Sequence, residues 1–452
     1  MPDTIAALAT SAGVSAIGII RLSGAESIAI AEKLFHPASG KRLSACREHS
    51  LIYGELRSRD GNMLDSCLCT YSRGPKSYTG EDTAELQCHG SPVILRAVLE
   101  EIFSLGARQA AAGEFTKRAF LNGRLELTAA EAVADIIEAD SIETARNAAA
   151  QLSGAIGRKS DAVYAALSDI SSHYHAVLDY PDEDIEDFTL SGYADSIEGA
   201  ISSLEGLVRT FERGKLMKEG IPAVIAGRPN AGKSSLLNAL LGYDRAIVTA
   251  VAGTTRDTIE EKLRIGGVCL RLTDTAGIRE TEDQVERIGV ERSRSAIDHA
   301  QLVIAVVDAS RPVSCEDIEL VRLAETAPKG ILVLSKLDLN RGGSEIDTVL
   351  PTVSLSAVTG EGLSELEETI KGLFPLPNVP AGEILTNSRQ AEAIGRALES
   401  MKAAREAMLL GATPDIVLTE TENAMAALGE LSGRTVREDI TNRIFERFCV
   451  GK

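Results

Sequence analysis

The chain of 452 residues has no tryptophan, and aromatic residues make up only 4% of it. No apolar run reaches the roughly 18 residues that a membrane-spanning helix needs, and the start, Met1-Pro2-Asp3-Thr4, lacks the basic flank of a secretion signal. The seven cysteines include no Cys-x-x-Cys pair, which argues against a disulfide framework or a zinc site. We therefore expect a soluble cytoplasmic protein with reduced thiols.

The chain also has fewer basic than acidic residues, with a net charge of -19 and a pI near 4.9. A protein that holds nucleic acid by a general basic field is thereby disfavoured, and any RNA must meet a local patch. Hydrophobic residues at 44% and charged residues at 25% are typical of a globular protein. The length predicts about three domains.

The strongest motif lies between Ile221 and Leu241, where an apolar run is followed by Gly227-Arg228-Pro229-Asn230-Ala231-Gly232-Lys233-Ser234 and then by a helical pattern. The order strand, glycine-bounded loop, helix and the spacing GxxxxGK[ST] predict a phosphate-binding loop. Gly227 and Gly232 allow backbone N–H groups to face a phosphate, and the helix adds its positive dipole end. Lys233 is expected on the outer phosphates and the Ser234 hydroxyl on Mg²⁺.

Two later segments fit the switch regions of a nucleotide hydrolase. In Gly253-Thr254-Thr255 we expect Thr255 to place a hydroxyl on Mg²⁺ and a backbone N–H on the terminal phosphate. In Asp274-Thr275-Ala276-Gly277 we expect Asp274 to hold Mg²⁺ through water and the Gly277 N–H to bind the terminal phosphate. Loss of that phosphate would release both segments.

Base selectivity is predicted from Ser335-Lys336-Leu337-Asp338, which follows an apolar strand. A carboxylate at Asp338 accepts hydrogen bonds from N1–H and the amino group of guanine, and adenine offers neither donor there. Ser356-Ala357-Val358 would give a backbone N–H to the guanine carbonyl. The nucleotide should therefore be GTP. The motifs above give as its expected contacts Asn230, Ala231, Gly232, Lys233, Ser234, Ser235, Gly253, Thr254, Thr255, Asp274, Thr275, Ala276, Gly277, Ser335, Lys336, Leu337, Asp338, Ser356, Ala357 and Val358.

The position after Gly277 bears on the mechanism of hydrolysis. Many switch GTPases carry a glutamine there that orients the attacking water, but this chain has Ile278, which cannot do so. Another polar group has to orient the water. Spacing leaves four acidic residues open and, for each of them, favours a solvated carboxylate at a helix start: Glu280, Glu282, Asp283 and Glu286.

The rest of the chain divides by pattern. Residues 1–122 read as a compact mixed domain, with strands at 16–22, 51–56, 67–71 and 84–89 and a helix at 91–105. For its polar clusters, 21–24 and 77–82, pattern alone favours turns with solvated charge.

Residues 123–214 show the pattern of long helices, with a capping box from Thr128 to Glu131, and the acidic stretch 179–187 is expected to be a solvated loop. Residues 215–376 alternate strand and helix, and helices return at 389–410, 415–431 and 436–448 within 377–452. The α/β part is thus expected to be inserted into one helical domain whose halves pack together.

These motifs resemble the MnmE (TrmE) family of tRNA modification GTPases over the whole chain. The most specific marks are the phosphate loop, Gly253-Thr254-Thr255-Arg256-Asp257, Val285-Glu286-Arg287-Ile288-Gly289, Tyr78-Thr79-Gly80-Glu81-Asp82 and the terminal Phe448-Cys449-Val450-Gly451-Lys452. The resemblance implies a multidomain α/β and all-α protein: an N-terminal α+β domain that is folate-binding-like, a discontinuous helical domain and an inserted Ras-like G domain.

The resemblance also implies partners and cofactors. It implies a homodimer formed through the N-terminal domains, and an FAD-binding GidA-type (MnmG) partner in a heterotetramer or larger complex that acts on the wobble uridine of tRNA. The cofactors would be GTP, Mg²⁺, K⁺ and 5-formyl- or 5,10-methylene-tetrahydrofolate.

The resemblance also implies roles for individual residues of this chain. The water-orienting acid becomes Glu286, and Cys449 is implicated in the modification step. The K⁺ ligands become Asn230, Thr249, Val251 and Thr254, and the resemblance adds the loop Thr249, Ala250, Val251 and Ala252 to the expected GTP-binding residues. The folate contacts become Arg21, Glu85, Arg124 and Lys452. Arg and Lys suit the carboxylates of a folate, and Glu85 suits the pterin edge.

This sequence departs from the family pattern at two of these sites. The family has lysine at Arg124, which keeps the charge but changes the donor geometry. It has asparagine at Ser335, whose shorter side chain is expected to reach the base and the phosphate loop less well and to weaken nucleotide binding. Two other readings remain: a regulatory switch GTPase in ribosome assembly or signalling, which needs neither the N-terminal domain nor Cys449, and an ATP-using P-loop enzyme, which Asp338 disfavours.

Overall fold

The computed structural model describes residues 3–179, 193–243, 261–265, 268–272, 297–339, 346–375, 379–433, 438–446 and 448–451. The chain forms two compact units: residues 1–137, 148–205 and 392–452 make up the first, and residues 138–147 and 206–391 make up the second. Within the described residues, no helix is long and apolar enough to cross a membrane.

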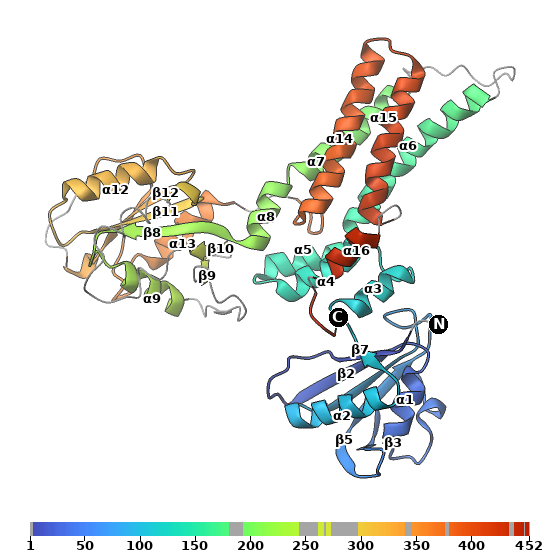
Figure 1. Ribbon diagram of the computed structural model, residues 1–452. Coiled ribbons are helices and arrows are strands. Elements are labelled where there is room, and N and C mark those ends of the chain that lie inside the picture. The colour runs from blue at the N-terminus through green and yellow to red at the C-terminus, as the bar shows by residue number, and fades with distance from the viewer. Residues whose placement is uncertain are drawn as a thin grey trace. The chain divides into compact units, whose positions relative to one another are not determined.

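The first unit contains a seven-stranded sheet with the order β3-β4-β5-β6-β2-β1-β7, antiparallel except for the β1–β7 pair (Figure 1). Helices α1 and α2 share one buried core with the sheet, so they cover one of its faces. Along β5 the burial alternates, as expected for a strand buried on one side. The bounds are β1 Ile5–Leu8, β2 Ile17–Ser23, α1 Ser27–Leu34, β3 Phe35–Pro37, β4 Ile52–Arg57, β5 Met63–Ser72, β6 Thr83–His89, α2 Pro92–Ser104, β7 Arg108–Gln109 and α3 Glu114–Leu121.

The four strands and the helix predicted in this part are confirmed, whereas β1, β3, β7, α1 and α3 were not predicted. The polar clusters were interpreted wrongly. Ser23 and Thr79 are fully buried and their hydroxyls lie 2.7 Å apart, and Ser23 also donates to Glu81 at 2.8 Å. Arg118 donates to the same carboxylate at 3.0 Å. These residues form an internal hydrogen-bond network and not a solvated turn.

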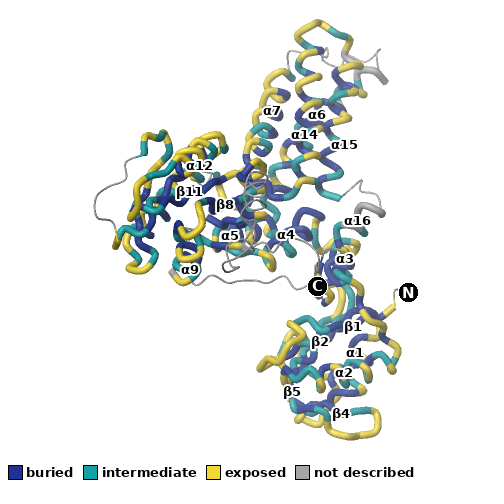
Figure 2. The backbone as a smooth tube through the Cα atoms, turned by 60° about the vertical axis from the view of Figure 1, so that its left-hand side comes forward, coloured by how far each residue is buried: buried dark blue, intermediate teal, exposed yellow. Residues whose placement is uncertain are grey.

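Helices from both ends of the helical region pack against one another. Lys402 and Arg405 of α14 form ion pairs with Glu205 and Glu198 of α7, at 2.7 and 3.2 Å. Figures 1 and 2 show α6 and α15 side by side, with their buried residues turned inward. The expected packing of the two helical halves is therefore confirmed. The bounds are α4 Leu127–Glu138, α5 Ile142–Leu152, α6 Ala155–Asp179, α7 Ala194–Val208, α8 Phe211–Glu219, α14 Ser388–Leu409, α15 Pro414–Ser432 and α16 Glu438–Phe445.

The capping box predicted at Thr128 is wrong. Helix α4 begins at Leu127, so Thr128 lies inside its first turn, and its buried Oγ1 has no hydrogen-bond partner among the described residues. Of the acidic stretch 179–187, only Asp179 belongs to the described residues, as the last residue of α6.

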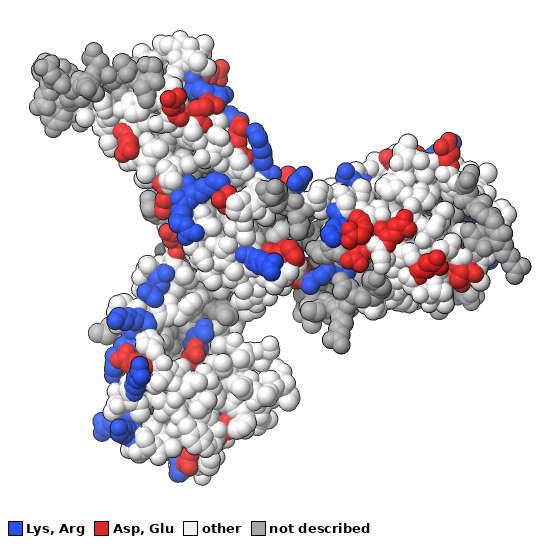
Figure 3. Space-filling view, turned by 180° about the vertical axis from the view of Figure 1, so that it is seen from behind, with Lys and Arg blue, Asp and Glu red and all other residues white. Residues whose placement is uncertain are grey.

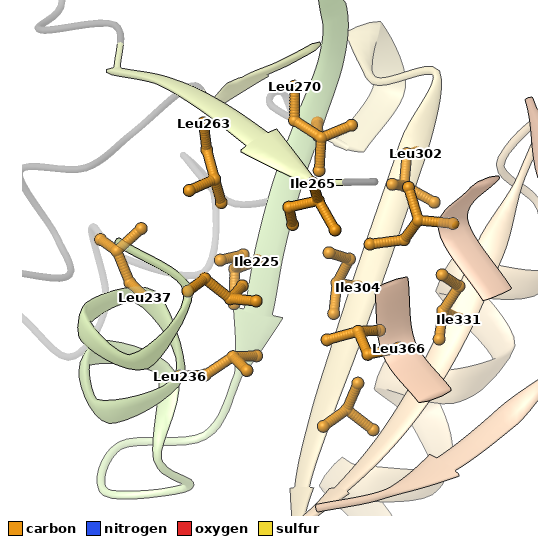
Figure 4. Packing of buried hydrophobic residues seen from close by; sticks show 14 of the residues in the cluster. Ile225, Leu236, Leu237, Leu263, Ile265, Leu270, Leu302, Ile304, Ile331 and Leu366 are labelled. Atoms are coloured by element: carbon orange, nitrogen blue, oxygen red, sulfur yellow. The ribbon is translucent and has the colours of Figure 1, made fainter. Parts of the chain in front are cut away.

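The second unit contains a six-stranded sheet with the order β13-β12-β11-β8-β10-β9, in which only the β9–β10 pair is antiparallel. Such a sheet is buried on both faces. Figure 4 shows one face, where Ile225, Ile304 and Ile331 of the strands meet α9 and α13. On the other face, residues such as Val303 pack with Ala324 of α12. The bounds are β8 Ile221–Gly227, α9 Lys233–Tyr243, β9 Glu261–Ile265, β10 Val268–Leu272, β11 Leu302–Asp308, α12 Cys315–Glu325, β12 Gly330–Ser335, η3 Leu337–Leu339, β13 Thr352–Ser354 and α13 Leu363–Leu373.

The parallel strands β8, β11, β12 and β13 all end at the same edge of the sheet. Their last residues are Gly227, Asp308, Ser335 and Ser354. In open α/β sheets ligands bind outside the carboxyl ends of the strands. The candidate site is therefore built by the loops that follow these four residues.

Candidate nucleotide site

The loop from Gly227 to Ser234, here called the phosphate loop, joins β8 to α9. Its backbone is left-handed at Asn230 (φ 62°) and at Gly232 (φ 100°). A Cβ at Gly227 would lie 2.6 Å from the carbonyl oxygen of Val306 on the neighbouring strand. Glycine is thus required at Gly227 by close approach and is favoured at Gly232 by conformation. The turn brings the chain directly into the N-terminus of α9, which is where an anion binds.

Lys233 points back into the phosphate loop. Its ammonium donates to the carbonyl oxygens of Gly227 and Arg228, at 2.7 and 2.9 Å. Burial lowers the pKa of Lys233. A bound phosphate would compensate the buried charge, so the site favours an anion. Ser234 and Ser235 follow it on the exposed side of the first turn of α9.

The segment Ser335–Asp338, here called the guanine loop, is bonded to the phosphate loop at two successive residues. The Ser335 hydroxyl donates to Ala231 O at 2.5 Å and lies 3.1 Å from Val307 O. The Lys336 ammonium donates to Asn230 O at 2.7 Å. The expectation that Ser335 reaches the phosphate loop poorly is therefore wrong, because its short side chain is buried beside that loop. The expected loss of affinity remains a prediction.

Asp338 is exposed at the end of the guanine loop, and its Oδ1 accepts a hydrogen bond from the Ser356 hydroxyl at 2.6 Å. Ser356 is fully buried and its backbone N–H donates to Glu361 O at 3.0 Å. A backbone N–H for a guanine carbonyl must then come from Ala357 or Val358. The Ser356 side chain bonds the Asp338 carboxylate, and the contact of the segment 356–358 with guanine stays a prediction.

Several expected site residues lie outside the described residues. They are Thr249, Ala250, Val251, Ala252, Gly253, Thr254, Thr255, Asp274, Thr275, Ala276, Gly277, Glu286 and Lys452. Of the expected K⁺ ligands only Asn230 is described, and it is exposed on the phosphate loop.

The expected folate residues of the first unit are partly brought together. Arg21 on β2 and Glu85 on β6 are register partners, and Nε of Arg21 lies 2.8 Å from Oε1 of Glu85. The guanidinium also lies over the rings of Tyr78 and Phe115, at 5.5 and 5.7 Å from their centroids. Arg124 is exposed, and its Nε donates to the carbonyl oxygen of Ser77 at 3.1 Å.

The C-terminal segment lies beside the start of α3 within the first unit. Val450 forms a β-bridge with Ala112, and Gly113 N–H donates to Cys449 O at 3.3 Å. Gly113 has a φ of 63°, and a Cβ there would lie 2.6 Å from the carbonyl oxygen of Phe445. Cys449 itself is exposed. Gly113 is two residues before Phe115, over whose ring the Arg21 guanidinium lies.

Two side chains of the site were not found from the sequence. Asp308 ends β11 and binds Lys336 at 2.7 Å. Arg228 of the phosphate loop binds Glu316 at 2.7 Å and the hydroxyl of Ser314, the N-cap of α12, at 3.0 Å. A carboxylate directly after the apolar run 302–307 was the available signal for Asp308, since the carboxyl end of a buried strand faces the site. No comparable sequence signal marked Arg228.

The phosphate loop is bounded by glycines and joins the buried strand β8 to helix α9. It is bonded to the guanine loop, a Lys-x-Asp loop that follows β12, two strands away in the sheet. This arrangement defines a P-loop nucleotide-binding domain. Two family models match the chain: "GTP-binding protein TrmE N-terminus" at residues 4–124 and "MnmE helical domain" at residues 127–449. Relatives named "tRNA modification GTPase MnmE" match it from end to end. That of Symbiobacterium thermophilum is 42% identical over 100% of this chain and 99% of its own length, and that of Clostridioides difficile is 41% identical over the same shares. The chain therefore belongs to the MnmE family.

Among solved structures, the G domain of the T. maritima FeoB iron transporter is 29% identical over 34% of this chain and 98% of its own. The TM-score of 0.26 is too low to define a shared fold.

Proposed function

We propose that this chain is a GTP hydrolase that takes part in tRNA modification. The observation that carries the proposal is the pair of bonds from Ser335 and Lys336 to the phosphate loop, which join the segment that ends at Asp338 to the loop that contains Lys233. This arrangement supports a site in which Lys233 binds the phosphates and Asp338 reads guanine. Membership of the MnmE family supports the same activity.

In this proposal the described residues bind and orient the nucleotide. Lys233 and the backbone N–H groups of the phosphate loop bind the phosphates, and Asp338, held by Ser356, accepts the two donors of guanine. Glu286 orients the attacking water, while Thr255 and the segment 274–277 respond to the terminal phosphate.

Two of the residues expected to hold metal ions are described: Ser234 on the first turn of α9 and Asn230 on the phosphate loop are both exposed, so an ion can reach their oxygen atoms. Ser234 and Thr255 would hold Mg²⁺. Asn230, Thr249, Val251 and Thr254 would hold K⁺ through neutral oxygens, and K⁺ supplies positive charge where other GTPases use an arginine.

The remaining parts of the proposal concern the whole protein. The N-terminal domain binds a one-carbon tetrahydrofolate through Arg21, Glu85, Arg124 and Lys452 and forms a homodimer in the cytoplasm, and Cys449 takes part in the modification step. An FAD-binding GidA-type partner joins it to modify the wobble uridine of tRNA, and GTP hydrolysis drives the approach of the G domains. We also propose four domain segments: the N-terminal domain at 1–122, the two halves of the helical domain at 123–214 and 377–452, and the G domain at 215–376.

The acidic character of this chain supports the proposal that the partner makes a large share of the contacts with tRNA. Figure 3 shows acidic side chains gathered on the second unit, while basic ones follow one edge of the sheet domain of the first unit. With a net charge of -19 the chain has no general attraction for RNA.

The test is nucleotide hydrolysis by the full chain, with phosphate release measured for GTP and ATP in KCl and in NaCl at matched ionic strength. We expect hydrolysis of GTP and not of ATP, and faster hydrolysis in KCl. Equal rates with ATP would overturn the guanine assignment. Equal rates in the two salts would remove only the potassium mechanism.

A further inference from the structure

Asp308 has a defined place in the nucleotide site although no motif includes it. It ends β11 as the register partner of Ser335, the first residue of the guanine loop. Its side chain is only 12% exposed. Ser310 donates to Oδ1 from its backbone N–H at 3.0 Å and from its hydroxyl at 2.6 Å, and Lys336 donates to Oδ2 at 2.7 Å. Arg311 Nε also lies 3.7 Å from Oδ2. The carboxylate thus binds both the turn that follows it and the guanine loop.

The charge of Asp308 is stabilised where it lies. Burial alone would raise the pKa of this carboxyl, but the hydrogen bonds from Lys336 and Ser310 outweigh burial and lower the pKa below its ordinary value. At neutral pH the Lys336 ammonium is therefore held between an ionised carboxylate and the carbonyl oxygen of Asn230.

Lys336 and Ser335 are the two side chains of the guanine loop that bond to the phosphate loop, and of these two Lys336 is the one that binds Asp308. Its backbone has a φ of 59°, a left-handed conformation that a lysine adopts when its surroundings hold it. Its side chain crosses from the guanine loop to the phosphate loop, where Asn230 is also left-handed, with a φ of 62°. Without Asp308 the ammonium would keep one neutral acceptor, and water would compete for its other protons.

Resting on the GTPase function proposed above, we propose that Asp308 is a positioning residue for guanine nucleotides: through Lys336, it holds the guanine loop against the phosphate loop before the nucleotide arrives. A site whose two halves are already in register loses less freedom on binding, so its affinity is higher. The effect belongs to binding and not to the hydrolytic step, because Asp308 has no place in the orientation of the water.

The experiment compares full-length wild type, Asp308→Asn, Lys336→Met and the double variant. The dissociation constant for fluorescent N-methylanthraniloyl-GDP and the kcat for GTP are measured in KCl with Mg²⁺. For Asp308→Asn we expect a dissociation constant about tenfold higher, since a charge-assisted bond is replaced by a neutral one, and a kcat within about twofold of wild type. In the Lys336→Met background the same substitution should change the constant by less than about twofold, because the partner is already gone.

The controls separate positioning from folding. Asp298→Asn removes an exposed carboxylate of the same unit and should leave both quantities unchanged. Ser310→Ala removes one donor to Asp308 but keeps its charge, and we expect about a threefold rise in the dissociation constant. If Asp308→Asn fails to fold, this variant carries the test.

Three results would overturn the proposal: an Asp308→Asn affinity within about twofold of wild type, an undiminished effect in the Lys336→Met background, or a fall in kcat with the affinity unchanged. Should wild type itself not bind the fluorescent GDP, the GTPase function fails and not only the role of Asp308.

Discussion

The Ser356 hydroxyl donates a hydrogen bond of 2.6 Å to the carboxylate of Asp338, and it does so from a fully buried position. Asp338 is exposed, so this bond is what orients the carboxylate that is expected to read guanine. The bond joins the loops that follow β12 and β13. Base selectivity is thus expected to depend on a residue that does not itself touch the base through its side chain.

Ser356→Ala should raise the dissociation constant for GDP about fivefold, because the carboxylate loses the donor that fixes its direction. The kcat at saturating GTP should stay within about twofold of wild type. Fluorescence titration with labelled GDP measures the first quantity and phosphate release the second. Thr369→Ala, which removes a hydroxyl that bonds only within α13, is the matched control. An unchanged affinity would show that Asp338 holds its direction without Ser356.

Ser335→Asn should bind GDP and GTP more tightly than wild type, by about threefold to tenfold. The single hydroxyl proton of Ser335 is directed at Ala231 O, whereas an asparagine amide has two protons to donate. Ser335→Ala should bind more weakly than wild type, since it leaves the Ala231 carbonyl without this bond. Isothermal titration on the three proteins gives the order. No gain for Ser335→Asn would contradict the expected penalty of the serine.

Arg21→Ala should lower the affinity for 5-formyl-tetrahydrofolate at least about tenfold, because a cation for the folate carboxylates is lost. Arg96→Ala removes an exposed arginine from α2 of the same domain and should leave folate binding unchanged. The exchange Arg21→Glu with Glu85→Arg keeps an ion pair across β2 and β6 but reverses it. It should keep most of the stability of the domain and still lose folate binding. Restored folate binding in the exchanged pair would argue against a direct role for these two side chains.

The sequence predicted the second unit well because local signals and function coincide there. The phosphate loop, the Lys-x-Asp loop and their strands are set by short-range rules on glycine, buried runs and helix starts, so Lys233, Ser335 and Asp338 were found in their correct elements. Asp308 was not found, since its partner Lys336 lies 28 residues further on and only strand pairing brings them together.

The first unit was less predictable for a similar reason. Ser23 and Thr79 read as turn residues, because serine, threonine and glycine favour turns in local statistics. Their burial depends on pairing between distant segments: the two hydroxyls bond to each other, and Ser23 also donates to Glu81, which in turn accepts from Arg118. The capping box predicted at Thr128 was wrong for a different reason. The local capping pattern is present, but helix α4 begins one residue before Thr128.

The stability of the first unit should depend on pH through Glu114. Burial would raise the pKa of this carboxyl, but bonds from Arg108, Ala111 and Arg118 lower the pKa from its ordinary value of 4.5 to about 2. A depressed pKa stabilises the folded state above the unfolded value, so the contribution is complete above about pH 5 and is lost as the pH falls towards 2. We expect Glu114→Gln to lose about 2 kcal/mol of stability at pH 7, and a smaller amount at pH 3.

Amide hydrogen exchange in peptides that cover α3 measures this free energy of opening at each pH. Glu100→Gln, at an exposed carboxyl of α2, should follow the wild-type pH dependence throughout, because it removes no such bond. A difference between Glu114→Gln and wild type that stays constant from pH 7 to pH 3 would contradict the prediction. Such a result would mean that Glu114 stabilises α3 by packing and not by its charge.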